Sequence, residues 1–321
     1  MTATGRAQRV RERESLAGWS AELQDAVTAM FSQLDGGTFH EANWARPGGG
    51  GGRARLLSEG RVFEKAGVNR ALVEGPLPAS AAARLGGSVP LGTDVHFFAT
   101  GVSVVAHPRS PMVPTVHLNV RFVELLDAAG NRFDAWYGGG ADLTPMHPIP
   151  EDARHFHREL KRTCDAYSPA IFVRCKPWCD EYFRNPHREN EARGVGGIFF
   201  DHLRPSEAPF GLAPPRLHAF VDAVGRALVT AYAPIVERRR DLPFTERDRA
   251  LQLHRRGRYV EFNLLHDRGT LFGLQTGART ESVLMSMPPV AAWPAPREPA
   301  PGSIEDELAA MLVPRDWATE D

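Results

Sequence analysis

The chain has 321 residues, of which 42% are hydrophobic and 24% are charged, as expected of a globular protein with a sizeable core. Its formal net charge of −1 gives no global field that would attract nucleic acid or an anionic membrane, so neither is an expected partner. Its 3 cysteines are too few for a disulfide framework, and we find neither a signal peptide nor an apolar run of the ~20 residues that span a bilayer. These features predict a cytoplasmic protein.

In the first part of the chain, one segment has a clear helical pattern of apolar residues, and two others are expected to be loop or irregular. Apolar residues at helical spacing over 16–34 predict an amphipathic helix that follows a tail at 1–15. The glycine run at 48–52 is flexible and predicts a mobile loop. A phosphate-binding loop is excluded, because it would need a Gly-Lys-Ser/Thr ending that is absent. Residues 76–92, rich in proline, alanine and glycine, are expected to be irregular.

Between residues 95 and 137 the apolar residues recur at every second position, which is the period of a β-strand. Strands are predicted over 101–107, 115–124 and 132–137, and the sequence DAAGN at 127–131 predicts a tight turn between the last two. We therefore expect an antiparallel meander in this region.

In the second half of the chain, segments with the helical period alternate with segments that have the period of a β-strand. A strand is predicted at 194–201, and Ser303 with Asp306 resembles the capping box of a last helix. Clusters of strands separated by helices indicate the α+β class, with helices packed on one antiparallel sheet in a single domain. The predicted helices cover 150–167, 176–184, 215–232 and 245–256, and the C-terminal strands cover 258–265, 270–275 and 281–289.

The predicted strand at 115–124 carries the clearest functional signal. Its apolar residues share one face, so His117, Asn119 and Arg121 form a row on the other face, about 7 Å apart along the strand. An imidazole, an amide and a guanidinium on one rigid element suit the floor of a site for a carboxylate-bearing substrate. A surface strand with arbitrary polar residues is the alternative. Ser103 and His107 share a face of the preceding strand and would line the same cleft, unless His107 merely ends that strand.

Three consecutive glycines, at 138–140, directly follow the predicted strand 132–137, and such a run is costly in conformational entropy. We expect the run to let the backbone approach a large flat ligand. Asp142 would then lie at the rim, where its carboxylate would accept from an N–H donor or act as a base. The alternative is a tight turn in which Asp142 caps the turn or a helix.

Several histidines are candidates for a metal site. His155 and His157 would point apart on a helix, so at most one of them binds an ion, and His157 is the better candidate because it borders the apolar stripe. Together, His107, His117, His157 and His187 would suit a divalent ion, although no recognised ligand spacing unites them.

Long stretches of the sequence resemble the oxygen-dependent coproporphyrinogen III oxidases. They include PTVHLNVRF, WYGGGADLTP, GVGGIFFD and RRGRYVEFNLL, and the likeness runs in order from about residue 16 to 318. It implies a large flat antiparallel sheet flanked by helices on both faces, in a homodimer formed through residues 259–294. It also implies a reaction of haem biosynthesis, in which O2 and no organic cofactor decarboxylates two propionates of coproporphyrinogen III to vinyl groups, giving protoporphyrinogen IX.

The resemblance implies roles for individual residues. His117 would be the proton donor, and Asp142 would meet the pyrrole N–H groups and draw a proton, so that O2 adds to the ring. Arg279 would bind substrate, whereas its context alone also allows an ordinary loop arginine. A divalent, manganese-like ion would bind His107, His117, His157 and His187. The implied substrate contacts are Ser103, Asn119, Val120, Arg121, Gly277, Ala278 and Arg279.

Two other functions remain open on the residues themselves. A metal-dependent hydrolase or non-haem oxygenase would use the histidines and would lose activity with a chelator. A non-catalytic tetrapyrrole-binding protein would use the same arginines and would bind its ligand without releasing CO2.

Overall fold

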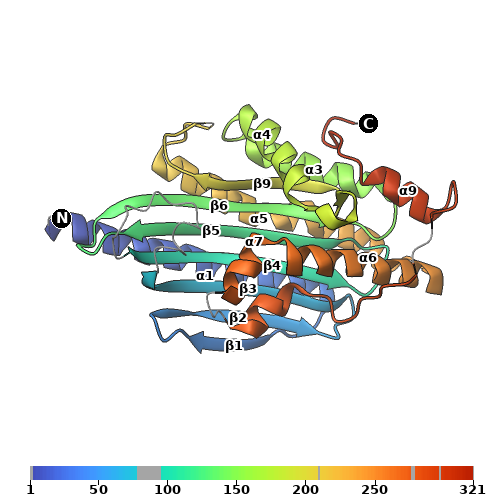
Figure 1. Ribbon diagram of the computed structural model, residues 1–321, viewed down its shortest axis with the longest axis horizontal. Helices are drawn as coiled ribbons and strands as arrows, with labels where there is room; N and C mark the ends of the chain where they lie inside the picture. Colours follow the sequence, from blue (N-terminus) through green and yellow to red (C-terminus); the bar gives the residue numbers. More distant parts are fainter. Residues whose placement is uncertain (1–2, 78–94, 209, 276–278, 296–297, 321) are drawn as a thin grey trace.

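The computed structural model describes residues 3–77, 95–208, 210–275, 279–295 and 298–320. They form a single mixed α+β unit around a seven-stranded antiparallel sheet, as the sequence predicts (Figure 1). Sequential strands are neighbours in the sheet up to β6, and β9 joins at the edge beside β6. The strands are β1 (His40–Ala45), β2 (Gly50–Ser58), β3 (Phe63–Leu77), β4 (Val95–Pro108), β5 (Thr115–Leu126), β6 (Arg132–Thr144) and β9 (Gly196–Leu203).

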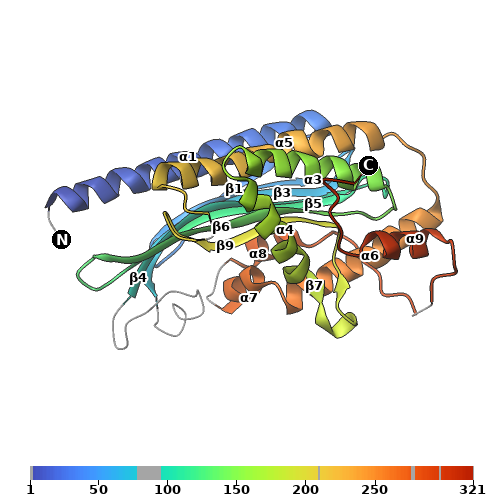
Figure 2. The ribbon, with the colours of Figure 1, turned by 90° about the horizontal axis from the view of Figure 1, so that it is seen from above.

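Helices cover both faces of the sheet (Figure 2). On one face lie α1 (Ala3–Asp35), α3 (Pro150–Asp165) and α5 (Pro214–Arg239), while α4 (Pro169–Tyr182) packs along β9. The other face carries α6 (Glu246–Leu265), α7 (Arg268–Gln275), α8 (Thr280–Val283) and α9 (Ile304–Met311). Short elements complete the fold: the hairpin of β7 (Arg184–Asn185) and β8 (Glu191–Ala192), and the 3-10 turns η1 (Pro186–Arg188) and η2 (Leu284–Ser286).

The alternation in β5 decides which face of the sheet is core. Val116, Leu118, Val120 and Phe122 are buried in one hydrophobic cluster with side chains of α1 and α5. Among the described residues only α5 is long and apolar enough to cross a bilayer, and 56% of its most apolar window is buried inside the fold, as in the core helix of a globular domain. The opposite face of β5 is therefore the one available for a site.

The helix predicted over 16–34 starts earlier than expected, because α1 begins at Ala3 and includes most of the segment assigned to a tail. The reason lies in the fully buried carboxylate of Glu124 on β5, which needs cationic partners. Arg13 from the added helical turns approaches Glu124 to 2.7 Å, and Arg132 approaches it to 2.7 Å from β6.

The glycine run at 48–52 is not a free loop, since β2 begins at Gly50 and pairs with both β1 and β3. A Cβ at position 52 would lie 2.3 Å from the ring of Trp44, so glycine there makes room for the aromatic side chain. The segment expected to be irregular at 76–92 lies outside the described residues from 78 onward.

The three C-terminal strands are also wrong, because 258–265 lies in α6, 270–275 lies in α7, and 281–286 belongs to α8 and η2. A capping box between Thr245 and Asp248 starts α6, and its buried side chains follow a helical spacing that runs through Leu251, Arg255 and Tyr259. The sequence hides this period because buried polar residues such as Arg255 interrupt the apolar stripe. By contrast, α9 begins where Ser303 predicts, with the Ser303 side chain accepting from the amide of Asp306.

Candidate active site

A cavity of about 420 Å³ lies between the sheet face opposite α1 and α5 and the C-terminal helices. Strands β4, β5, β6 and β9 supply its floor, and α4, α6, α7, α8 and η2 supply its roof. Ser103, His117, Asn119 and Arg121 all line it, as the face assignment of the two strands predicts. The polar row on β5 is therefore the floor of a pocket and not a solvent-exposed surface.

The register of β4, β5 and β6 arranges the floor in rows. The rows that contain Asn119 and Arg121 otherwise hold only glycine and serine, which makes this part of the floor flat and leaves Ser103, Asn119 and Arg121 as its polar groups. Successive rows are about 7 Å apart, so Arg121 lies about 13 Å along the strand from His117. The rows are Val105–His117–Asp142, Ser103–Asn119–Gly140 and Gly101–Arg121–Gly138.

Asp142 differs in position from its sequence-based expectation. The glycines at 138–140 lie inside β6 and not beyond its end, so Asp142 is a strand residue directly opposite His117. Its side chain is 2% exposed, and it lies beneath the cavity lining and not at a rim. One oxygen, Oδ1, accepts from Nδ1 of His117 at 2.7 Å, while Oδ2 accepts from Arg193 at 2.7 Å.

Burial alone would raise the pKa of Asp142, but Arg193 and His117 beside it hold that pKa below its ordinary value. Asp142 is therefore an ionised acceptor, and Nδ1 of His117 carries the hydrogen between them. The other ring nitrogen, Nε2, remains for a ligand in the cavity, which His117 lines with 21% of its side chain exposed. The pair forms an oriented imidazole of the kind that general acid–base chemistry uses.

Arg193 is a site residue that sequence reasoning missed. Its guanidinium is buried, lies 4.0 Å from the ring centroid of Phe183, and donates to Oδ1 of Asn263 at 3.0 Å as well as to Asp142. Burial would lower its pKa, but Asp142 raises it above the ordinary value. Nothing in the sequence distinguishes it, because 38 residues are lysine or arginine.

Arg121 has partners that the sequence did not predict. Its Nη2 donates to Oδ1 of Asp201 at 2.7 Å, and its Nη1 donates to Oδ1 of Asn119 at 2.9 Å. Asp201 also lines the cavity, from β9. The segment GVGGIFFD ends on this aspartate. The available signal was the alternation in the strand, which places Asp201 on the face opposite Ile198 and Phe200.

The remaining expected substrate contacts are not brought together on this floor. The side chain of Val120 is buried in the core on the opposite face, and its backbone lies in the ladders to β4 and β6. Gly277 and Ala278 lie outside the described residues. Arg279 is described; it is exposed, pairs with Glu281 at 3.0 Å, and is not among the residues that line this cavity.

The four candidate metal ligands have separate partners. His107 is buried, with Nε2 2.8 Å from the carbonyl oxygen of Ser286, and His157 is buried, with Nδ1 2.8 Å from the carbonyl oxygen of Ala153. Burial lowers the pKa of each of these two to about 3, so both are neutral.

The other two ligands are likewise engaged. His117 contacts Asp142, and His187 contacts Glu261 at 2.9 Å and His266 at 2.8 Å. Within the described ranges no three His, Cys, Asp or Glu side chains form a group that could hold a metal ion. The donors present therefore do not fit one shared ion in this chain.

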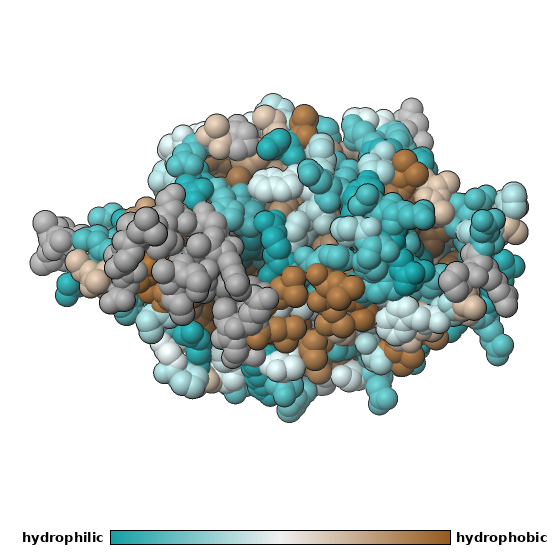
Figure 3. Space-filling view, viewed as in Figure 1, coloured by the Kyte–Doolittle hydropathy of each residue, from teal (hydrophilic) through white to brown (hydrophobic). Residues whose placement is uncertain are grey.

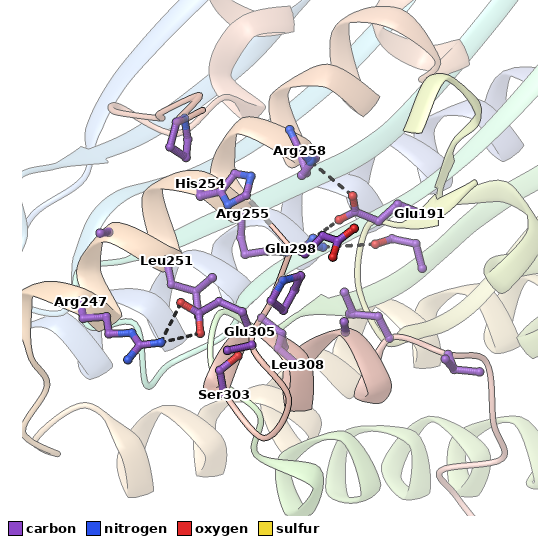
Figure 4. A pocket seen from close by; sticks show the side chains of 18 of the residues that line it. Glu191, Arg247, Leu251, His254, Arg255, Arg258, Glu298, Ser303, Glu305 and Leu308 are labelled. Atoms are coloured by element: carbon purple, nitrogen blue, oxygen red, sulfur yellow. Dashed lines mark hydrogen bonds and ion pairs between the residues drawn. The ribbon is translucent and has the colours of Figure 1, made fainter. Parts of the chain in front are cut away.

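A second and larger cavity, of about 1010 Å³, lies between α6, α9 and the β7–β8 hairpin (Figure 4). Its charged side chains are largely paired with one another, as Arg247 is with Glu305 at 3.0 Å and Arg258 with Glu191 at 3.3 Å. It contains none of the predicted site residues. A hydrogen bond links the linings of the two cavities: Arg255, which lines this one, donates to the carbonyl oxygen of Arg193, which lines the first, at 3.3 Å.

A flat floor with an oriented imidazole at one end and an arginine at the other, under a roof of helices, defines an α+β protein with a cavity suited to a broad, carboxylate-bearing small molecule. The family model described as coproporphyrinogen III oxidase matches residues 15–317 of this chain. The chain therefore belongs to the coproporphyrinogen III oxidase family, whose members are oxidoreductases that decarboxylate coproporphyrinogen in haem biosynthesis.

Proposed function

We propose that this protein catalyses the oxygen-dependent decarboxylation of two propionates of coproporphyrinogen III to vinyl groups, giving protoporphyrinogen IX. The observation that carries the proposal is the spacing of His117 and Arg121 on one flat floor. A macrocycle with four propionates can lie on the small residues between them, with one propionate near the imidazole and another on the guanidinium.

The stoichiometry of each step fits O2 as the only oxidant. One propionate, one O2 and one proton give one vinyl group, one CO2 and one H2O2, and the two electrons that reduce O2 come from the substrate. Loss of a pyrrole N–H proton makes the ring electron-rich enough to add O2. The resulting peroxide takes a proton from the β-carbon of the propionate and leaves as hydrogen peroxide when the ring C–O bond breaks. Loss of CO2 then forms the vinyl group, and the pyrrole nitrogen regains its proton.

Within this scheme the chain supplies proton transfer and orientation. Because Asp142 is covered, we assign the exchange of a proton with the substrate to Nε2 of His117, and Asp142 holds the imidazole in that tautomer. Arg193 keeps Asp142 ionised. Arg121 binds a propionate that is not reacting.

One assay tests the proposal. Purified protein is incubated with coproporphyrinogen III in air and under argon, and products are followed by mass and by porphyrin fluorescence after oxidation. We expect loss of two carboxyl groups in air alone. Equal turnover under argon would identify an oxygen-independent reaction, binding without CO2 release would identify a carrier, and activity that a chelator abolishes would favour the metal-dependent oxygenase.

We also propose that the protein acts as a cytoplasmic homodimer through residues 259–294. Exposed large apolar side chains concentrate in this stretch, and apolar surface gathers near the centre of the face that carries α7 and α8 (Figure 3). Such patches on a globular surface are typical of protein interfaces. The exposed residues are Leu264, Leu265, Leu274, Leu284, Val290 and Trp293.

A further inference from the structure

Three adjacent strands, β5, β6 and β9, each place one residue at the same position along the sheet. Arg121 on β5, Gly138 on β6 and Asp201 on β9 lie side by side, and the guanidinium reaches across β6 to the carboxylate at 2.7 Å. Both charged side chains line the cavity, about 13 Å along the strands from His117.

Gly138 leaves the space through which this ion pair passes. A Cβ at position 138 would lie 2.6 Å from Oδ1 of Asp201 and 2.7 Å from Nη2 of Arg121. The three nearest atoms that such a Cβ would meet all belong to these two side chains, so a side chain at 138 would collide with the ion pair.

Asp201 is fixed more firmly than Arg121. The same oxygen that binds Arg121 also accepts from the backbone amide of His202 at 3.0 Å, and the side chain of Asp201 is only 9% exposed. The side chain of Arg121 is 34% exposed. A guanidinium has five N–H donors, and its bonds to Asn119 and Asp201 use two of them, which leaves donors for a ligand.

We propose that Asp201 is a positioning residue that holds the guanidinium of Arg121 in the orientation that receives a substrate propionate. The inference rests on the proposed function. Asp201 does not itself bind the propionate, since two carboxylates repel each other. It acts by ordering Arg121 before the substrate arrives, so that binding does not have to immobilise a flexible arginine.

The test is a double-mutant cycle on steady-state kinetics with coproporphyrinogen III in air. Asp201→Ala should raise KM roughly three- to tenfold, the cost of ordering one long side chain, with kcat within about twofold of wild type. Asp201→Asn should restore KM to within about twofold, because Oδ1 of an asparagine can accept the same two hydrogen bonds. In an Arg121→Ala background, Asp201→Ala should have no further effect.

The outcomes separate this inference from the function on which it rests. A wild-type protein that does not decarboxylate the substrate refutes the proposed function. With active wild type, an unchanged or lowered KM for Asp201→Ala, or a rise that persists without Arg121, refutes the positioning role. If Asp201→Ala does not fold, Gly138→Ala takes its place, because it displaces the ion pair without removing the carboxylate and should produce the same Arg121-dependent rise in KM.

Discussion

Nδ1 of His117 and Oδ1 of Asp142 lie 2.7 Å apart on directly paired residues of β5 and β6. The sheet register thus creates the pair, and Arg193 completes it by binding the second oxygen of Asp142. That Asp142 meets the substrate directly stays a prediction from the sequence, and the geometry here favours an indirect role because Asp142 is covered. This geometry makes the carboxylate the orienting partner of His117, with the imidazole edge facing the cavity.

Asp142→Asn should lower kcat by about 10²- to 10⁴-fold while KM changes little, because the amide no longer fixes the tautomer of His117. Steady-state kinetics on the purified variant checks this. Asp134→Asn is the matched control: Asp134 lies on the same strand but pairs with Arg204 at 2.8 Å and does not line the cavity. A kcat for Asp142→Asn close to that of the control would contradict the role of Asp142.

The two faces of β5 should respond differently to substitution. Val120→Ala removes buried core volume and should lower the free energy of unfolding by about 2 kcal/mol without changing KM. Asn119→Ala should raise KM and leave the stability almost unchanged, since Asn119 lines the cavity. Denaturant unfolding and kinetics measured on both variants provide the check. A raised KM for Val120→Ala would contradict the separation of roles between the two faces.

Glu261 should make stability depend on pH in the acid range. Burial would raise the pKa of Glu261, but hydrogen bonds from Arg188, His187 and Trp293 lower it to about 2. A lowered folded-state pKa means that the ionised group stabilises the fold above its ordinary pKa of 4.5, and that this contribution is lost as the pH falls from 4.5 towards 2.

Glu261→Gln should therefore lower Tm at pH 7, and the difference from wild type should shrink as the pH is lowered below about 4.5. Thermal unfolding followed by circular dichroism across this range measures it. Glu307→Gln, on an exposed position of α9, controls for the loss of one surface charge. A Tm difference that stays constant down to pH 3 would refute the assignment.

Removal of divalent metal should not reduce activity, because the four candidate histidines do not form a metal-binding group within the part of the chain that the structure describes. Protein dialysed against a chelator, with its metal content checked by elemental analysis, is assayed in air. Loss of activity that is restored by one added ion would show that the donors assemble in a way not seen here.

Leu265→Asp should shift the mass in solution from dimer towards monomer, since Leu265 is 56% exposed in the stretch assigned to the interface. Light scattering coupled to size-exclusion chromatography measures this mass. Val173→Asp, at a 70% exposed position on α4, is the control and should stay dimeric. The same mass for both variants would place the interface elsewhere.

Local periodicity explains which elements could be predicted. The strict alternation at 115–124 is a property of a single strand, so β5 and the common face of His117, Asn119 and Arg121 follow from it. The C-terminal strands failed because RYVEFNLL is short enough to fit both periods, and the buried Arg255 and Asn263 disguise the helical one.

The sequence by itself determined the α+β class, the polar row on β5 and, through long matching stretches, the family, because each depends on residues that are close in the chain or on whole motifs. The tertiary structure alone decided how the row is used. Arg193 reaches Asp142 across 51 positions of sequence and Asp201 reaches Arg121 across 80, so no local pattern links them. Asp142 is buried beside His117 and Arg193, a position that follows from the sheet register and from the segment before β9 and not from any local pattern.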